Sequence, residues 1–147
     1  MATSRPPSGS RRGSSKPQLP ELFCDRSLGR IKVPTRLRAV HPVVIAHDDV
    51  FPQDTDDEVW LAEAGRRRWV VLMKDDRLRY RPGEQQAVLQ ARVACFCLNP
   101  SKGMTAEQMA DAFITALPTI VRIVEHASKG GYIKGINRKG RVRHLFP

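Results

Sequence analysis

The sequence is poor in cysteine, aromatic residues and acids, and it has no long apolar run. Its three cysteines, Cys24, Cys95 and Cys97, are too few for a disulfide framework, and none forms a CxxC pair. No apolar stretch approaches the roughly 20 residues of a membrane span, and residues 1–20 lack the apolar core of a secretion signal. We therefore expect buried, reduced thiols in a cytoplasmic protein with no membrane partner.

Familiar catalytic motifs are also missing. The four histidines are scattered without HxxxH or HExxH spacing, and the sequence has no GxGxxG, GxxxxGK[ST] or GxSxG. Zinc chemistry, nucleotide binding on a glycine-rich loop and a serine nucleophile on a sharp turn therefore have no support here.

Positive charge is abundant and unevenly placed. Lys and Arg number 25 against 15 Asp and Glu, which gives a formal charge of +10. Residues 1–20 are rich in Ser, Pro and Gly and carry basic residues without an acid, so we predict a disordered arm followed by one domain over 21–147. A basic surface favours a polyanionic partner such as RNA, although solubility alone could also explain it.

Four short apolar runs predict buried strands, and the segments between them predict helices. The strands are expected at 21–25, 43–46, 69–73 and 93–98, and the helices at 34–38, 55–64, 84–90 and 106–126. Residues 131–146 read as a terminal basic β-hairpin around a glycine-bearing turn. Strands that alternate with helices predict an α/β sandwich with a mainly parallel sheet.

Helix ends have their own signals. Thr55 with Glu58 predicts a capping box, Gly65 a helix stop, and Thr105 a second helix cap. Pro118 is expected to kink or divide the last helix.

Three acids occur where predicted strands end or a helix begins. Asp25 ends the first strand, Asp75 follows the third, and Asp57 lies in the first turn of the helix between the second and third. Asp25 and Asp75 would share a crevice if their strands are neighbours, whereas Asp57 would start at the other end unless the loop 48–55 carries it back. Converging carboxylates favour a hard divalent cation, Mg²⁺ or Mn²⁺. Alternatively, these acids have structural roles only, because Asp is also favoured at helix caps and in turns.

These segments resemble a known family. The stretches 23–29, 57–61 and 69–80 are similar, in order and spacing, to the PIN-like domains grouped with VapC-type toxins, and the likeness runs from about Leu22 to Leu145. The resemblance implies a three-layer α/β/α sandwich and cleavage of RNA that depends on Mg²⁺ or Mn²⁺. It also implies an antitoxin protein that inserts into the active-site groove.

Carried over by position, the resemblance assigns roles to particular residues. It implies that Asp25, Asp57 and Asp75 are catalytic and hold the metal, with Asp56 as the alternative for the middle position. Four basic residues near these acids are expected to bind the RNA backbone: Arg26, Lys74, Arg77 and Arg79.

Two departures from the family pattern keep other functions open. Met73 stands where relatives often have Thr, and Asn99 rather than an acid follows the fourth strand. The leading hypothesis is a metal-dependent ribonuclease, the toxin of a toxin–antitoxin pair. The alternatives are a catalytically silent nucleic-acid-binding module of the same fold and a domain that binds an acidic protein. The RNA target and the oligomeric state, a homodimer included, stay open.

Overall fold

The computed structural model describes residues 19–74, 82–100, 103–127 and 130–147. The basic arm that we predict over residues 1–20 therefore lies almost wholly outside the described residues. The elements, in chain order, are β1 (Leu22–Cys24), the 3-10 helix η1 (Arg26–Leu28), α1 (Lys32–Arg38), β2 (Val44–Ala46), α2 (His47–Val50), α3 (Asp57–Arg67), β3 (Val70–Lys74), α4 (Pro82–Ala91), β4 (Ala94–Leu98), α5 (Ala106–His126), β5 (Tyr132–Ile136) and β6 (Val142–Phe146).

The strands form one sheet in the order β2-β1-β3-β4-β5-β6. Strands β1 to β5 pair in parallel, and β6 pairs with β5 in antiparallel orientation. The predicted parallel sheet and the predicted terminal hairpin are both confirmed. The short apolar runs form these strands because a parallel strand is covered on both faces and tolerates few polar residues.

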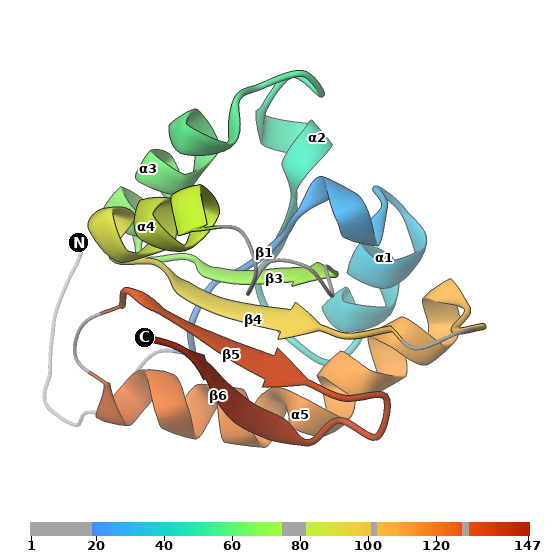
Figure 1. The fold of residues 1–147 in the computed structure, drawn as a ribbon. Helices are drawn as coiled ribbons and strands as arrows, with labels where there is room; N and C mark the ends of the chain where they lie inside the picture. The colour runs from blue at the N-terminus through green and yellow to red at the C-terminus, as the bar shows by residue number, and fades with distance from the viewer. Residues whose placement is uncertain (1–18, 75–81, 101–102, 128–129) are drawn as a thin grey trace, which may run out of the picture.

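Helices cover both faces of the sheet and give three layers (Figure 1). One core joins α1 and α5 to side chains such as Leu22 and Cys24, and the other joins α3 and α4 to side chains such as Phe23. Alternate residues of β1 thus enter opposite cores, as the two-residue period of a strand requires. The three-layer α/β/α sandwich expected from the sequence is confirmed.

Aromatic rings fill the core under α3. Phe23 stacks on Trp60 with 5.4 Å between ring centroids and on Trp69 with 5.1 Å. Both tryptophans are almost completely buried. This packing fixes the first turns of α3 against the end of β1, which is where the candidate site lies.

Several helix ends differ from the sequence prediction. Thr55 does not cap α3, because its hydroxyl donates to the carbonyl of Pro52 at 2.7 Å and Asp56 is the N-cap residue. Gly65 does not end α3, which continues to Arg67 and ends on Arg68 in a left-handed conformation. Gly65 lies inside the helix, at a position that has no room for a side chain, because a Cβ there would be 1.9 Å from the carbonyl oxygen of Ala91 on α4.

The last helix follows the prediction at its start. Thr105 and Gln108 form a reciprocal capping box, with bonds of 3.1 and 2.9 Å. Pro118 does not divide α5, which runs unbroken from Ala106 to His126. Its ring is exposed, so the helix accommodates it on the solvent side.

All three cysteines are buried and free, as expected from their scarcity. Among the described helices none is both long and apolar enough to cross a bilayer.

Candidate active site

The site lies at the carboxyl end of β1, which is paired with β2 on one side and β3 on the other. Ligands of parallel α/β proteins collect where the strand order reverses, and this is that point of the sheet. Asp25 follows β1 directly, and its backbone N–H donates to the carbonyl of Leu72 on β3 at 2.9 Å. The ends of β1 and β3 are therefore neighbours, which is the condition under which the sequence places Asp25 and Asp75 together.

Asp25 is held in place by the turn that follows it. Its side chain is largely buried, and its carboxylate Oδ2 accepts the backbone N–H of Ser27 at 3.1 Å, which caps η1. No described residue donates a hydrogen bond to the second carboxylate oxygen. The turn thus fixes the orientation of the Asp25 carboxylate at the end of β1.

Ser27 also secures the end of the neighbouring strand. Its hydroxyl oxygen accepts the backbone N–H of Lys74, the last residue of β3, at 3.0 Å. The serine hydroxyl therefore joins η1 to the point at which the chain leaves β3 toward Asp75. The lysine side chain is half-buried there.

Asp57 lies beside the segment that follows β1. Its Oδ1 accepts hydrogen bonds from Arg26 Nη2 at 3.0 Å and from the indole Nε1 of Trp60 at 2.9 Å. Of the two arrangements left open for Asp57, the structure therefore has the one in which the first turn of α3 lies at the carboxyl end of β1. A helix that follows a parallel strand runs back across the sheet, so its first turn lies at the carboxyl end by default.

The two candidates for the middle acid have different surroundings. Asp56 is the exposed N-cap of α3, and its side chain makes no capping hydrogen bond. Asp57 is paired with Arg26, whose guanidinium also donates to the carbonyl of Gln53. Contacts with the end of β1 therefore favour Asp57, although the roles of both acids stay predictions.

The remaining predicted site residues, Asp75, Arg77 and Arg79, lie outside the described residues. Within the described ranges, no group of three or more His, Cys, Asp or Glu side chains is placed to hold a metal ion. The donors at this edge, Asp25 and Asp57, nonetheless offer carboxylate oxygens, which are the ligands that Mg²⁺ and Mn²⁺ prefer. The donor chemistry therefore fits a hard divalent cation, with its third carboxylate expected from Asp75.

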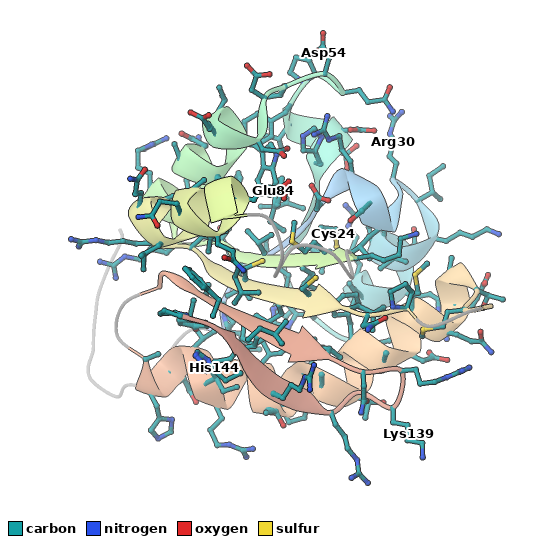
Figure 2. The ribbon with its side chains drawn as sticks, in the orientation of Figure 1. Cys24, Arg30, Asp54, Glu84, Lys139 and His144 are labelled. Atoms are coloured by element: carbon teal, nitrogen blue, oxygen red, sulfur yellow. The ribbon has the colours of Figure 1, made fainter. Side chains whose placement is uncertain are left out.

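An acidic groove adjoins Asp57. It has a volume of about 610 Å³ and lies between the first turns of α3 and α4. Its acidic lining residues are Asp56, Asp57, Glu58 and Glu84. Figure 2 labels Glu84 at the start of α4, above the sheet. The charged side chains that the described residues contribute to the groove are thus acidic although the chain as a whole is strongly positive, which favours a cationic ligand at this place.

Sequence reasoning missed His47. This residue begins α2 directly after β2, is almost completely buried, and bonds through Nδ1 to Asp48 Oδ1 at 2.8 Å. Its Nε2 is buried and finds no partner in the described part of the chain. The ring lies against Phe23 and Phe51, with centroid separations of 6.0 and 5.6 Å. Only the apolar segment before His47 could have signalled this burial.

Cys24, which precedes Asp25, is not a thiolate. Burial raises the pKa of the Cys24 thiol to about 12, Arg38 opposes this shift, and the charge of Asp25 adds to it. A neutral, buried thiol is neither a nucleophile nor a metal ligand at neutral pH. Of these two neighbouring groups, the Asp25 carboxylate and not the Cys24 thiol can therefore bind a cation.

Comparison with known proteins bears on both the fold and the site. Residues 20–100 match the family model described as "PIN like domain". The chain is 31% identical over 108 residues to "Putative ribonuclease VapC45" of Mycobacterium tuberculosis, covering 71% of this chain and 78% of the relative. No solved structure gives a significant match. Asp25 and Asp57 both fall inside the matched segment.

Proposed function

Because this chain belongs to the PIN-like domain family, we propose that it is a ribonuclease and the toxin of a toxin–antitoxin pair. The observation that supports the proposal is the contact of Arg26 with Asp57, which joins the first turn of α3 to the residue that follows Asp25. The similarity to a protein named as a VapC ribonuclease supports the same reaction class.

The reaction is the hydrolysis of a phosphodiester. Water adds across one P–O ester bond, so that one product keeps the phosphate and the other gains a hydroxyl. A bound Mg²⁺ or Mn²⁺ supplies Lewis-acid stabilisation of the charge that develops on the phosphate oxygens. Asp25, Asp57 and Asp75 would hold this ion, and a carboxylate at the site can also orient the attacking water and accept its proton.

Arg26 has two tasks in this proposal. Its guanidinium orients Asp57 through the 3.0 Å bond, and one third of the Arg26 side chain remains exposed to a substrate. A guanidinium can pair with two oxygens of a phosphate, which suits it to hold the RNA backbone next to the carboxylates. Lys74 ends the strand beside Arg26 and would extend this contact.

The direct test is a pair of variants at adjacent positions. Asp57→Asn keeps an oxygen for the bonds from Arg26 and Trp60 but removes the charge that a cation needs, so we expect cleavage in Mn²⁺ to be lost. Asp56→Asn is the matched control, and it should retain cleavage. The reverse result would assign the middle role to Asp56, and full cleavage by both variants would remove this helix start from the site.

The same experiment extends to Asp25 and Asp75. Asp25→Asn and Asp75→Asn should abolish cleavage in Mn²⁺ while RNA binding, measured with chelator present, stays equal or becomes tighter. Tighter binding is expected because each substitution removes a negative charge that repels the phosphate. Unchanged cleavage in both variants would disprove the proposal that Asp25 and Asp75 hold the metal ion for the reaction.

The acidic groove suggests how the antitoxin would bind. Its acidic wall at the start of α3 adjoins Asp57, so a basic segment of the antitoxin that enters the groove would reach the catalytic carboxylates. Charge complementarity of this kind sets specificity and association rate. We expect Glu84→Lys to weaken the complex with the antitoxin in a pull-down at low salt while cleavage is retained.

The second candidate is a catalytically silent RNA-binding domain. It is favoured by the pairing of Asp57 with Arg26, which already neutralises one acid without a metal ion. This candidate predicts RNA binding that falls steeply with salt and no cleavage in Mg²⁺ or Mn²⁺. Chelator-sensitive cleavage by the wild type would exclude it.

A further inference from the structure

A second cavity lies at the end of the sheet opposite the candidate active site. Its volume is about 550 Å³, and residues from the beginnings of β3, β4 and β5 line it together with residues from the ends of α3, α4 and α5. In Figure 1 this end of the sheet is the one at which the arrows of β3, β4 and β5 begin. Three of the lining residues are arginines, namely Arg66, Arg68 and Arg92. The proposed hydrolysis makes no use of them.

Two of these arginines occupy positions that favour glycine. Arg68 has a φ of 58° and Arg92 a φ of 59°, and in the described part of the chain no other non-glycine residue has a positive φ. Each follows the last residue of a helix, α3 and α4 respectively. Glycine is the usual residue there because it adopts left-handed backbone without strain. Two helices in succession therefore carry an arginine where the backbone favours glycine, and both arginines line one cavity.

The helix ends themselves do not need the guanidinium groups. The backbone N–H of Arg68 donates to the carbonyl of Gly65 at 3.2 Å, and the next N–H donates to Ala64 at 2.9 Å. The same pair of bonds ends α4 around Arg92, at 3.2 and 3.1 Å. The backbone thus satisfies these carbonyls. Within the described residues, neither the Arg68 nor the Arg92 side chain has a hydrogen-bond or ion-pair partner.

The walls of the cavity are held by close backbone contacts. A Cβ at Gly65 would be 1.9 Å from the carbonyl oxygen of Ala91, and a Cβ at Gly130 would be 2.0 Å from that of Arg92. The ends of α3 and α4 and the segment before β5 therefore touch where only glycine fits. This contact fixes the separation of the two arginine-bearing turns.

Tyr132 adds a neutral donor to the wall. The residue is 8% exposed, and no described residue forms a hydrogen bond with its hydroxyl. Burial raises the pKa of Tyr132 to about 12, so the hydroxyl keeps its proton at physiological pH. Apolar side chains also line the cavity, among them Val70 of β3, Ala94 of β4 and Val124 of α5.

We propose that this cavity binds a nucleotide. The phosphate lies on the guanidinium groups of Arg68 and Arg92, and the nucleoside occupies the apolar part of the cavity near Tyr132. Guanidinium groups match phosphate oxygens in pairs, and a cavity of this size accommodates a small molecule. The nucleotide is either free or one unit of an RNA strand. In the second case the inference rests on the proposed function, because the same strand would continue to the carboxylates.

The test removes the two side chains without disturbing the backbone. In the double variant Arg68→Gly/Arg92→Gly, glycine suits both left-handed positions, so we expect melting no lower than that of the wild type. The matched control is Arg122→Gln/Arg138→Gln, which removes the same charge from exposed positions outside the cavity. The probes are AMP, followed by calorimetry, and a short fluorescent single-stranded RNA, followed by anisotropy with chelator present.

We expect the glycine double variant to bind AMP at least about tenfold more weakly than the control does, because two charge-assisted bonds are lost. If the cavity takes one unit of a strand, the salt slope of RNA binding also falls by about 1.4, which corresponds to two phosphate contacts on a single strand. Loss of AMP binding with an unchanged slope identifies a site for a free nucleotide.

The inference is wrong if neither probe distinguishes the glycine variant from the control. Asp57→Asn, measured in parallel, should keep its affinity for AMP while losing cleavage. A failure of the proposed hydrolysis and a failure of the nucleotide site are thereby separated.

Discussion

The bond from Trp60 to Asp57 makes the candidate site sensitive to a buried indole. The indole Nε1 donates to Asp57 Oδ1 at 2.9 Å, and the ring stacks on Phe23. Trp60→Phe keeps an aromatic ring but removes the N–H donor that orients the carboxylate. We expect this variant to bind Mn²⁺ about 10–100-fold more weakly, the usual cost of losing a group that orients a metal ligand. Cleavage should fall with it.

Its effect on stability follows from the same geometry. A hydrogen bond to a charged group contributes about 1.5–3 kcal/mol. The Asp57 side chain is 48% exposed, so the lower end of that range applies. The volume lost in the core adds about 1 kcal/mol, for a total of about 2–3 kcal/mol. This corresponds to a fall in Tm of about 5–10 °C for a domain of this size.

Trp69 provides the matched control. Its indole Nε1 donates to a carboxylate of Glu21 at 3.0 Å, and its ring stacks on the same Phe23. Trp69→Phe should therefore cost similar stability in urea denaturation but leave Mn²⁺ affinity, measured by calorimetry, at the wild-type value. Equal losses of Mn²⁺ affinity in the two variants, or none in Trp60→Phe, would refute the reasoning.

Three further predictions concern stability. Because the pKa of Cys24 is raised in the folded protein, the contribution of its neutral thiol to the free energy of unfolding is complete below about pH 9 and is lost as pH rises toward 12. The free energy of unfolding, measured by urea denaturation, should fall by about 2 kcal/mol between pH 9 and 10.5, and by less in Cys24→Ala. Gly65→Ala should lose about 1–3 kcal/mol through its clash with α4, whereas Gly83→Ala, with open space around its Cβ, should not destabilise the protein in the same denaturation assay. Hydrogen bonds from Arg66 and Arg67 lower the pKa of Glu63 to about 2. The ionised carboxylate therefore stabilises the folded protein above about pH 4.5, and this stabilisation is lost as pH falls through 2. In Glu63→Gln the free energy of unfolding should depend less on pH over this range.

The strands of the sheet could be predicted from local sequence because each is a short, continuous apolar segment. The apolar segments that became β3 and β4 have no polar interruption, and only a strand covered on both faces requires this. The order of the strands was left open by the sequence, which stated only that Asp25 and Asp75 would share a crevice if their strands were neighbours; the structure gives the order. The positions of Asp25 and Asp57 at one edge are consequences of that order.

The helix ends could not be predicted in the same way. Thr55 has the right side chain for a cap, but the hydroxyl bonds to Pro52, and which carbonyl or N–H it meets depends on the loop conformation. Gly65 looks like a stop because glycine often ends helices, yet it serves the close approach of α4, a contact absent from local sequence. Arg68, where α3 ends, carries no sequence signal of a left-handed conformation. His47 was missed for a related reason, since its burial depends on aromatic rings from β1 and from the loop after α2.

The central claim is that the carboxylates of Asp25 and Asp75, which follow β1 and β3, bind one divalent cation together. Titration of Mn²⁺ followed by its paramagnetic resonance signal measures this directly, with the wild type compared to Asp25→Asn and Asp75→Asn. The account predicts that the wild type removes free Mn²⁺ from solution and that each variant binds it at least about tenfold more weakly. Equal Mn²⁺ affinity in all three proteins, or no binding by the wild type, would contradict it.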